Sequence, residues 1–370
     1  MDNPFLSEAA FVSPSLNRLR VVDLPGIQIP GQWRGLNGYD LLSAASLVAM
    51  IEAHAAELEM QATTPKLLQA FNNCFNSPSL TVQATARQIA KTYGRHLGIL
   101  LLTLERADAV NRRARPTWSR QHWQFWQSVA TVHIGGGLLS GAMGLHAVAS
   151  AQETLLDAGS DGMNLLLSPF AAYLSLAGLA RTAPPNTRAM LLFDFGQTNI
   201  KRAVAIRIAK DKIELHPLSK ISTPSGPDLF ASSERELAEA AASLITDVVV
   251  QSWLEAQNNY GPLDPVVGIS LACYLVNGHP PPSEMGYYGR MQILSVNLQN
   301  YLAAHIGQAI GREVQIALWH DGSAAGLAYA GSPNKVVMML GTAIGIGFAP
   351  SAVPGAQTYE PVSWNVELRW

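Results

Sequence analysis

The sequence predicts an α/β protein built from two parts, and three observations support this fold class. The first half of the chain shows helical periodicity: Leu41, Ala44 and Val48 recur at spacings of three and four. After a Pro-containing linker at residues 182–187 the pattern changes to short apolar runs typical of strands. The length of 370 residues is enough for two or three structural units.

Composition excludes several classes of protein. Hydrophobic residues make up 48% of the chain and charged residues 14%, below the usual ~25%, so a disordered chain is excluded. The net charge is −2, which predicts neither nucleic-acid nor membrane binding. The cysteines, Cys74 and Cys273, form no disulfide framework or metal cluster, so we expect no structural zinc.

The N-terminal residues lack the basic segment and apolar run of a signal peptide. Together with the sparse cysteines this predicts a cytoplasmic protein. Residues 121–152 contain no Asp, Glu, Lys or Arg, but His, Gln and Gly interrupt them. We expect a buried strand–turn–helix there rather than a membrane span, which needs ~20 predominantly apolar residues.

The first half is expected to be mainly helical after an irregular stretch at residues 1–38. Helices are predicted from Asp40 and over residues 80–104, each with one apolar face. A short buried strand at residues 129–134 then ends in three glycines. Apolar helices are expected on both sides of the turn at residues 157–162, up to Ala180.

The second half predicts an antiparallel meander followed by alternating helices and strands. A capping box at Ser233 and Glu236 begins the first helix, which is expected to end near Ala256. The order β-β-β-α-β-α-β is typical of a ribonuclease-H-like lobe. The expected strands are 190–195, 200–208, 212–221, 266–275 and 313–319, with a helix at 296–310 and a final strand pair within 335–349.

The first motif that suggests chemistry lies between two of these strands. Asp194 ends a buried strand, Gly196 follows two residues later, and Thr198 two after that. A glycine here lets the backbone approach a phosphate, and the Thr hydroxyl can bind an oxyanion. Asp194 could hold a magnesium ion through water. The alternative is an ordinary β-hairpin with a solvated Asp.

The second motif is a glycine-rich strand pair. Gly341, Thr342, Gly345 and Gly347 interrupt an apolar segment that glycines should weaken. A phosphate chain that approaches the backbone would explain them. The alternative is a bulged or tightly crossed hairpin.

The third motif is Asp321, where a strand meets an Ala-rich helix. Such an Asp could be a helix N-cap. It lies between the two glycine motifs in sequence, and a carboxylate there could accept the proton of a hydroxyl that attacks a γ-phosphate.

Together the three motifs resemble the ROK family of sugar kinases in the actin-like ATPase superfamily. The family has Asp-x-Gly-x-Thr as the first phosphate loop, Gly-Thr-x-x-Gly-x-Gly as the second, and a catalytic Asp at the start of an Ala-rich helix. The resemblance covers residues 190–349. It implies ATP and Mg²⁺ between two lobes, Asp321 as general base, and phosphoryl transfer to a small-molecule sugar. A homo-oligomer is left open.

The order of the segments suggests a circular permutation. In the family a whole second lobe follows the second phosphate loop, whereas this chain ends at Trp370. The helix at 80–104, the strand before Gly135 and the helix at 166–180 resemble that lobe instead. We therefore expect residues 1–181 to form part of lobe II, residues 188–334 lobe I, and residues 335–370 strands that return to lobe II.

This hypothesis predicts that residues 129–134 share a sheet with a strand from residues 335–370. Gly135, Gly136 and Gly137 then resemble the family's adenosine loop. The alternatives are an unrelated helical N-terminal domain with glycines for helix packing, and a dinucleotide site. The glycine spacing departs from the Gly-x-Gly-x-x-Gly fingerprint, and no clear βαβ unit surrounds it.

The family's Glu-x-Gly-His sugar motif and its Cys-rich zinc motif are both missing from the sequence. Asn277, His279 and Glu284 in the Pro-rich loop are substitute candidates for sugar contacts, although a solvated loop is the simpler interpretation. The missing sugar motif keeps a second function open: a non-catalytic sugar- or nucleotide-sensing protein on the same fold. A tryptophan cluster is expected to be core rather than an adenine platform: Trp118, Trp123 and Trp126.

Overall fold

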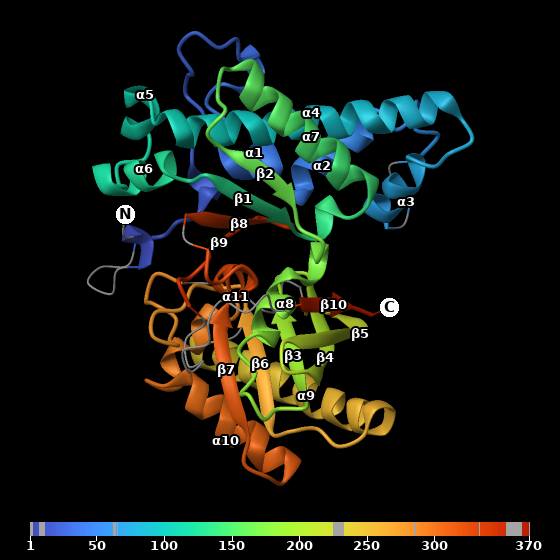
Figure 1. Cartoon of the computed structure of the whole chain (residues 1–370), viewed down its shortest axis with the longest axis vertical. Helices are drawn as coiled ribbons and strands as arrows, with labels where there is room; N and C mark the ends of the chain where they lie inside the picture. Colours follow the sequence, from blue (N-terminus) through green and yellow to red (C-terminus); the bar gives the residue numbers. More distant parts are fainter. Residues whose placement is uncertain are drawn as a thin grey trace. The chain divides into compact units, whose positions relative to one another are not determined.

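The computed structural model divides the chain into two compact units. Unit 1 comprises Met1–Ala172 and Asn334–Ile346, and unit 2 comprises Tyr173–Pro333 and Gly347–Trp370. The structure describes residues 3–6, 12–61, 64, 66–224, 233–284, 286–332, 334–352 and 365–369. Figure 1 shows the elements of each unit in sequence colours.

Unit 1 combines helices with a four-stranded sheet. Its helices are α1 (Gly38–Leu42), α2 (Ala44–Ala53), α3 (Leu67–Cys74), α4 (Leu80–Arg106), α5 (Ala109–Arg113), α6 (Arg120–Gln127) and α7 (Ala142–Asp157). Its strands are β1 (Thr131–Gly135), β2 (Asn164–Leu167), β8 (Lys335–Leu340) and β9 (Ile344–Phe348), and the chain passes into unit 2 near the end of β9.

The sheet of unit 1 joins segments that are far apart in sequence. Its strand order is β2-β1-β8-β9. Strand β1 pairs in parallel with β2 on one side and with β8 on the other, with His133 opposite Val337. The predicted pairing between residues 129–134 and the C-terminal segment is confirmed. Helix α7 packs on β2 and along α4, so the predicted strand–turn–helix at 121–152 is also present.

Unit 2 contains the larger sheet. Its strands are β3 (Ala189–Phe195), β4 (Asn199–Ala209), β5 (Lys212–Ser222), β6 (Val266–Leu271), β7 (Gln315–His320) and β10 (Asn365–Leu368). Its helices are α8 (Leu174–Ala180), α9 (Glu234–Tyr260), α10 (Leu298–Ile310) and α11 (Asp321–Leu327).

The six strands follow the order β10-β5-β4-β3-β6-β7. Strands β3, β4 and β5 form the predicted antiparallel meander, and β6 and β7 continue the sheet parallel to β3. The order β-β-β-α-β-α-β within residues 189–320 is therefore the one that the sequence predicts. Helix α9 begins after the predicted capping box of Ser233 and Glu236.

Different helices cover the two faces of this sheet. Since side chains alternate along a strand, odd- and even-numbered residues of β3 face different helices. Leu191, Phe193 and Phe195 of β3 pack in one core with α9 and α10. Helices α8 and α11 pack against each other, and both contact strand β6. Helix α8 also contacts β3, and α11 also contacts β7. A Cβ on Gly268 of β6 would touch Leu192 and Leu179, so the α8 side of the sheet carries the even-numbered residues of β3. Asp194 belongs to that set.

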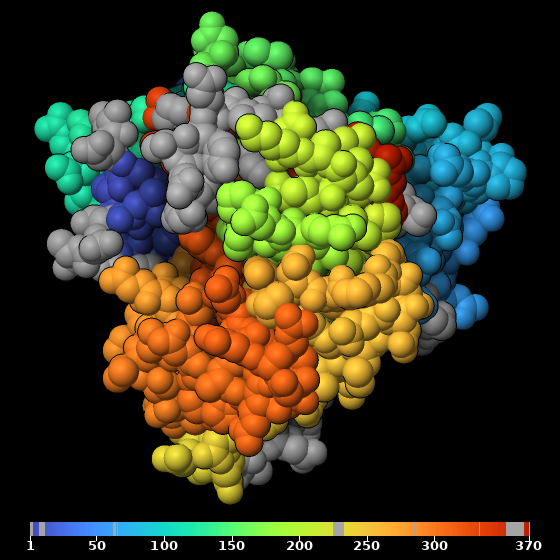
Figure 2. Space-filling view, turned by 60° about the horizontal axis from the view of Figure 1, so that its bottom comes forward, coloured from blue at the N-terminus to red at the C-terminus, as the bar shows by residue number. Residues whose placement is uncertain are grey.

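Helix α9 is long and apolar enough to cross a membrane by length and composition, with half of its most apolar window buried. Residues such as Ile245, Val249 and Trp253 lie in the core of unit 2. This is the packing of a core helix. In Figure 2 the surface of unit 2 shows α9 (gold) beside α10 (orange), which it contacts.

The structure differs from the sequence prediction in several places. A βαβ unit does surround the glycine cluster, because β1, α7 and the parallel strand β2 follow one another there. Residues 164–167 form strand β2 rather than helix, because a short apolar run does not distinguish the two. Helix α8 belongs to unit 2 rather than to the first part of the chain; all seven of its residues are buried there. Strand β10 does not return to the sheet of β1. It pairs with β5 of unit 2, where Lys212 and Glu367 form an ion pair at 2.8 Å.

Candidate functional site

Asp194 lies near the carboxyl end of β3 and is 4% exposed. Its neighbours across the sheet are Lys201 on β4 and Ser270 on β6. Lys201 Nζ lies 2.6 Å from Oδ2, and the Ser270 hydroxyl donates to Oδ1 at 3.0 Å. Both carboxylate oxygens are therefore held by residues that the strand register places beside them.

Lys201 connects Asp194 electrostatically with Asp321. Burial by itself lowers the pKa of Lys201, but the charge and hydrogen bond of Asp194 and the charge of Asp321 outweigh it and raise the pKa. Both carboxylates thus act on one ammonium group. They lie at the carboxyl ends of β3 and β7, where ligands bind in open α/β sheets.

Asp321 is the first residue of α11, and the N-cap is His320. The alternative that Asp321 is the cap is therefore wrong. Its Oδ1 accepts the Gly322 backbone N–H at 2.6 Å and lies 3.0 Å from His320 Nε2. The Ser175 hydroxyl of α8 donates to the Asp321 backbone carbonyl at 3.2 Å, which fixes the start of α11.

The loop between β3 and β4 is held at its base and exposed at its tip. The Gly196 carbonyl accepts from the Thr223 hydroxyl at 2.8 Å and from the Tyr288 hydroxyl at 3.4 Å. Thr198 lies in the exposed tip, and its carbonyl accepts the Thr223 N–H at 3.0 Å. The loop is therefore held at its base, with Thr198 in its exposed tip.

The second glycine motif begins in unit 1, in the turn between β8 and β9. The Gly341 carbonyl accepts the Ala44 N–H at the start of α2 at 2.9 Å. The Asn17 side chain exchanges two 2.9 Å hydrogen bonds with the backbone of Ile344. Thr342 is exposed at the tip of this turn. The turn is thus anchored on both sides.

Two of the predicted phosphate-loop glycines have different surroundings. A Cβ on Gly345 would lie 3.0 Å from Met339 Cε, the flexible end of a side chain. A Cβ on Gly347 would overlap the carbonyl oxygen of Gly322 in α11. Close backbone packing therefore explains Gly347 without a ligand.

The glycines after β1 lie beside the second glycine motif within unit 1. Gly136 has φ of +100°, and a Cβ there would overlap the backbone of Leu340, the residue before Gly341. Gly135 is the last residue of β1, opposite Met339. Space around Gly137 is open. The loops after the parallel strands β1 and β8 are therefore neighbours, and Gly136 is required by their contact.

The residues predicted to contact a sugar have structural roles in their loop. Asn277 and Gly278 both have positive φ and form a two-residue turn closed by hydrogen bonds between Val276 and His279. His279 Nε2 lies 2.9 Å from the Ser295 carbonyl. Glu284 lies near enough to Cys273 for its charge to act on that thiol.

The tryptophan cluster is core, as predicted. Trp118, Trp123 and Trp126 are each at most 5% exposed and pack with one another and with Phe5 in unit 1.

Sequence reasoning missed four residues that complete the site in unit 2. Lys201 and Ser270 hold Asp194, Tyr288 holds the first loop, and His320 contacts Asp321. The alternation of β4 carried a signal for Lys201, because a hairpin register places it opposite Asp194. The other three depend on contacts across the tertiary structure.

The residue expected to hold a magnesium ion through water is Asp194, and both of its carboxylate oxygens already have partners. Among the described residues, no cluster of three or more His, Cys, Asp or Glu side chains could hold a metal directly. Mg²⁺ commonly keeps several waters and uses one or two carboxylates plus substrate phosphates. Asp194 provides such a carboxylate, shared with Lys201 and Ser270.

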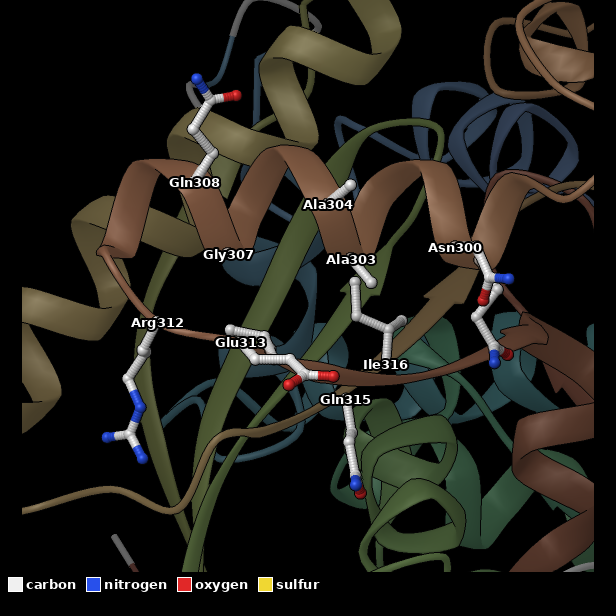
Figure 3. A pocket seen from close by; sticks show the side chains of 11 residues that line it. Asn300, Ala303, Ala304, Gly307, Gln308, Arg312, Glu313, Gln315 and Ile316 are labelled. Carbon is white, nitrogen blue, oxygen red and sulfur yellow. The ribbon is translucent and has the colours of Figure 1, made fainter.

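A surface pocket lies elsewhere in unit 2, between α10 and the beginning of β7. Figure 3 shows its polar lining, including Asn300, Arg312 and Gln315. It contains none of the predicted site residues and lies at the amino end of β7, whereas Asp321 follows the carboxyl end. We therefore locate the candidate site at the carboxyl ends of the strands.

No family model matches the sequence. No curated protein matches it either. Among solved structures, a chain described as "PilM-PilN type IV pilus biogenesis complex" is 18% identical with a TM-score of 0.26. The match covers 49% of this chain and 49% of that chain, so it spans about half the length of each.

Proposed function

We propose that the chain is a circularly permuted relative of the ROK-type sugar kinases within the actin-like ATPase superfamily. Its proposed activity is transfer of the γ-phosphoryl group of ATP to a hydroxyl of a sugar or sugar-like small molecule. The observation that carries this proposal is the Asp194–Lys201 pair at the carboxyl end of β3, with Asp321 directly after the carboxyl end of β7 in the same sheet. A cytoplasmic location belongs to the same proposal.

Each of the three residues has a defined part in this reaction. Asp321 would accept the proton of the attacking hydroxyl as the new P–O bond forms. Lys201 would offset phosphate charge, because its raised pKa keeps it protonated. Asp194 would hold magnesium through water, and the ion would neutralise charge on the phosphates. Positioning and electrostatics supply most of the catalysis in phosphoryl transfer.

Unit 1 supports a nucleotide role by itself. Its loops after β1 and β8 are neighbours and contain Gly137, Gly341 and Thr342 at accessible positions. We propose that the loop at Gly341–Gly345 contacts phosphates and that Gly135–Gly137 contact adenosine. The confirmed β1–β8 pairing supports the permutation, because it joins a strand from the first half of the chain with one from the segment after residue 334.

The test is ATP consumption by the full chain, screened over hexoses and amino sugars with Mg²⁺ present. One sugar should stimulate consumption, and Asp321→Asn should lower the rate ~10²–10⁴-fold, the usual contribution of a positioned base. ATP affinity and melting temperature should stay near the wild-type values. Equal turnover in wild type and variant would exclude Asp321 as the base.

A non-catalytic sensing protein is the second candidate. The structural role of His279 favours it, because its Nε2 already contacts the carbonyls of Gln292 and Ser295 and is less able to bind a sugar. Calorimetry separates the two functions. Binding of ATP or a sugar without turnover for any acceptor would favour the sensor.

A further inference from the structure

The antiparallel ladder between β4 and β5 contains a β-bulge. Arg202 of β4 is paired with Leu218 of β5. The next pair along the ladder is Ile200 with Ile221, where the register has shifted. Two residues of β5 therefore lie opposite Lys201 alone, which is the arrangement of a β-bulge.

The bulge consists of Ser219 and Lys220, and a buried arginine holds it in place. The Arg202 guanidinium donates to the Ser219 carbonyl through Nε at 2.9 Å and through Nη2 at 2.7 Å. Its Nη1 donates to Ser252 and Glu255 of α9 at 2.8 Å each. A bulge leaves backbone groups without ladder partners, and Arg202 satisfies one of them. The bulge is thus anchored to the helix on that side of the sheet.

The bulge changes the face of the sheet to which Lys220 belongs. Leu218 lies in the core with α9, and strict alternation from it would turn Lys220 to that same face. Because of the extra residue, Ile221 packs on this core instead, and Lys220 lies on the opposite face with Lys201. There Lys220 Nζ lies 5.7 Å from the centre of the Tyr173 ring, at the start of α8.

Two ammonium groups therefore lie at one end of the sheet with one carboxylate partner. Lys201 Nζ contacts Asp194 at 2.6 Å. Within the described ranges, Lys220 Nζ has no hydrogen bond or ion pair. Lys220 is exposed, yet partial burial lowers its pKa, and the charge of Lys201 lowers it further. Two neighbouring positive charges destabilise the folded chain until an anion binds to them.

The strand order shows which part of a ligand could meet Lys220. Asp321 follows β7 at one edge of the sheet. Asp194 lies on β3, Lys201 on β4 and Lys220 on β5, each farther from β7 than the one before. Since adjacent strands are about 4.8 Å apart, Lys220 is the farthest of these groups from the proposed base. A phosphate that contacts Lys220 is therefore not the one that the acceptor hydroxyl attacks.

We propose that Lys220 binds, next to Lys201, a phosphate group of the nucleotide that is not transferred. The inference rests on the nucleotide-binding part of the proposed function. An ammonium group donates charge-assisted hydrogen bonds to phosphate oxygens, and the two lysines offset charge that ATP and ADP have in common. Lys220 therefore contributes to nucleotide affinity rather than to the chemical step, and the β-bulge is the feature of the fold that brings it there.

Calorimetry of the full chain with ADP and Mg²⁺, and separately with inorganic pyrophosphate, tests this inference. Lys220→Met should raise the Kd of both ligands about tenfold, as expected for a lost hydrogen bond to a charged group. Lys220→Arg should retain most of the affinity. Lys210→Met is the matched control and should bind as wild type does, because Lys210 is an exposed lysine at the opposite end of the β4–β5 hairpin.

Two results of this calorimetry overturn the inference. One is unchanged affinity of Lys220→Met for ADP. The other is a loss of affinity for pyrophosphate alone, which would assign Lys220 to a free polyphosphate rather than to a nucleotide.

Unfolding without a ligand separates binding from a structural role. Removing one of two neighbouring positive charges should leave the melting temperature of Lys220→Met at or above that of wild type. If Lys220 only stacked on Tyr173, the variant would melt at a lower temperature and bind ADP as tightly as wild type does. That pair of results would also overturn the inference.

Turnover distinguishes this inference from the kinase proposal. With the sugar found in the acceptor screen, Lys220→Met should raise KM for ATP about tenfold and leave kcat within about twofold of wild type. A large fall in kcat with unchanged ADP affinity would place Lys220 at the transferred phosphate and contradict its assignment here. If no sugar supports turnover but ADP affinity depends on Lys220, the kinase proposal fails and this inference stands.

Discussion

Asp194 and Lys201 face each other across the β3–β4 hairpin, with Lys201 Nζ 2.6 Å from Asp194 Oδ2. Asp194 is buried and Lys201 keeps 22% of its side chain exposed. The pair lies next to the first glycine loop, so a charged pair is buried where the sequence predicts a phosphate.

Removing one partner of this pair should destabilise unit 2. Lys201→Met leaves the Asp194 carboxylate buried without its counter-ion, which typically costs ~3–5 kcal/mol; we expect the lower end because Lys201 is partly exposed. Asp194→Asn combined with Lys201→Met should recover most of the loss. Urea unfolding measures both, and equal stability of the single and double variants would contradict the coupling.

The stability of unit 1 should depend on pH through two buried histidines. Burial lowers the pKa of His96 and of His133 to about 4, with smaller contributions from Arg95 and Lys335 respectively. A lowered histidine pKa means that the unfolded chain binds protons first, so stability is full above ~6.5 and falls as the pH drops toward 4. Each histidine should cost about 2 kcal/mol between pH 7.5 and pH 5.

The measurement is urea unfolding at both pH values for wild type, His96→Asn and His133→Gln. Asn at position 96 can still donate to the Leu41 carbonyl that His96 Nδ1 contacts at 3.1 Å. Comparing each variant with itself at the two pH values cancels any cavity cost. An unchanged pH dependence in both variants would show that these histidines do not control it.

Two neighbouring glycines after β1 should differ in how much an alanine substitution destabilises unit 1. Gly136→Ala should destabilise unit 1 by about 3 kcal/mol or more, because the new Cβ would overlap the Leu340 backbone at a φ that suits glycine. Gly137→Ala has open space and should fold normally. Thermal melts check both. Gly137→Ala is then the variant in which a weaker affinity for ATP would report the adenosine role.

The second glycine loop offers a similar comparison. In Gly345→Val the new Cβ would meet Met339 alone, closest at its flexible end at 3.0 Å, so we expect the variant to fold. It should weaken ATP binding by about tenfold or more, ~1.4 kcal/mol, if phosphates approach there. Gly347→Ala should instead destabilise the fold through its overlap with Gly322. Calorimetry on folded Gly345→Val decides: wild-type affinity would remove the phosphate role.

Residues 1–181 expressed alone should not unfold cooperatively. Without β8, strand β1 has an unpaired edge and the sheet loses β9 as well. Fusing residues 334–352 to residues 1–172 through a flexible linker should restore a cooperative melt, because that chain contains all of unit 1. Cooperative melting of 1–181 by itself would indicate an independent N-terminal domain and argue against the permutation.

The sequence by itself determined the features that depend on local periodicity. The meander of β3, β4 and β5, the capping box at Ser233 and the glycine loops follow from alternation, capping and turn chemistry within short windows. The β1–β8 pairing was also predictable, but only through the resemblance to a known family. Asp194 and Asp321 were identified because an acidic residue at the end of a buried strand is conspicuous.

Only the tertiary structure decided which residues surround those carboxylates. Ser270 lies beside Asp194 because β6 pairs with β3, and His320 stacks on Tyr274, which follows the neighbouring strand β6. Helix α8 and strand β10 joined unit 2 because a mainly apolar helix and an open sheet edge are stabilised wherever a complementary surface exists. Such partners are chosen by packing and hydrogen bonding between distant segments, which no local pattern encodes.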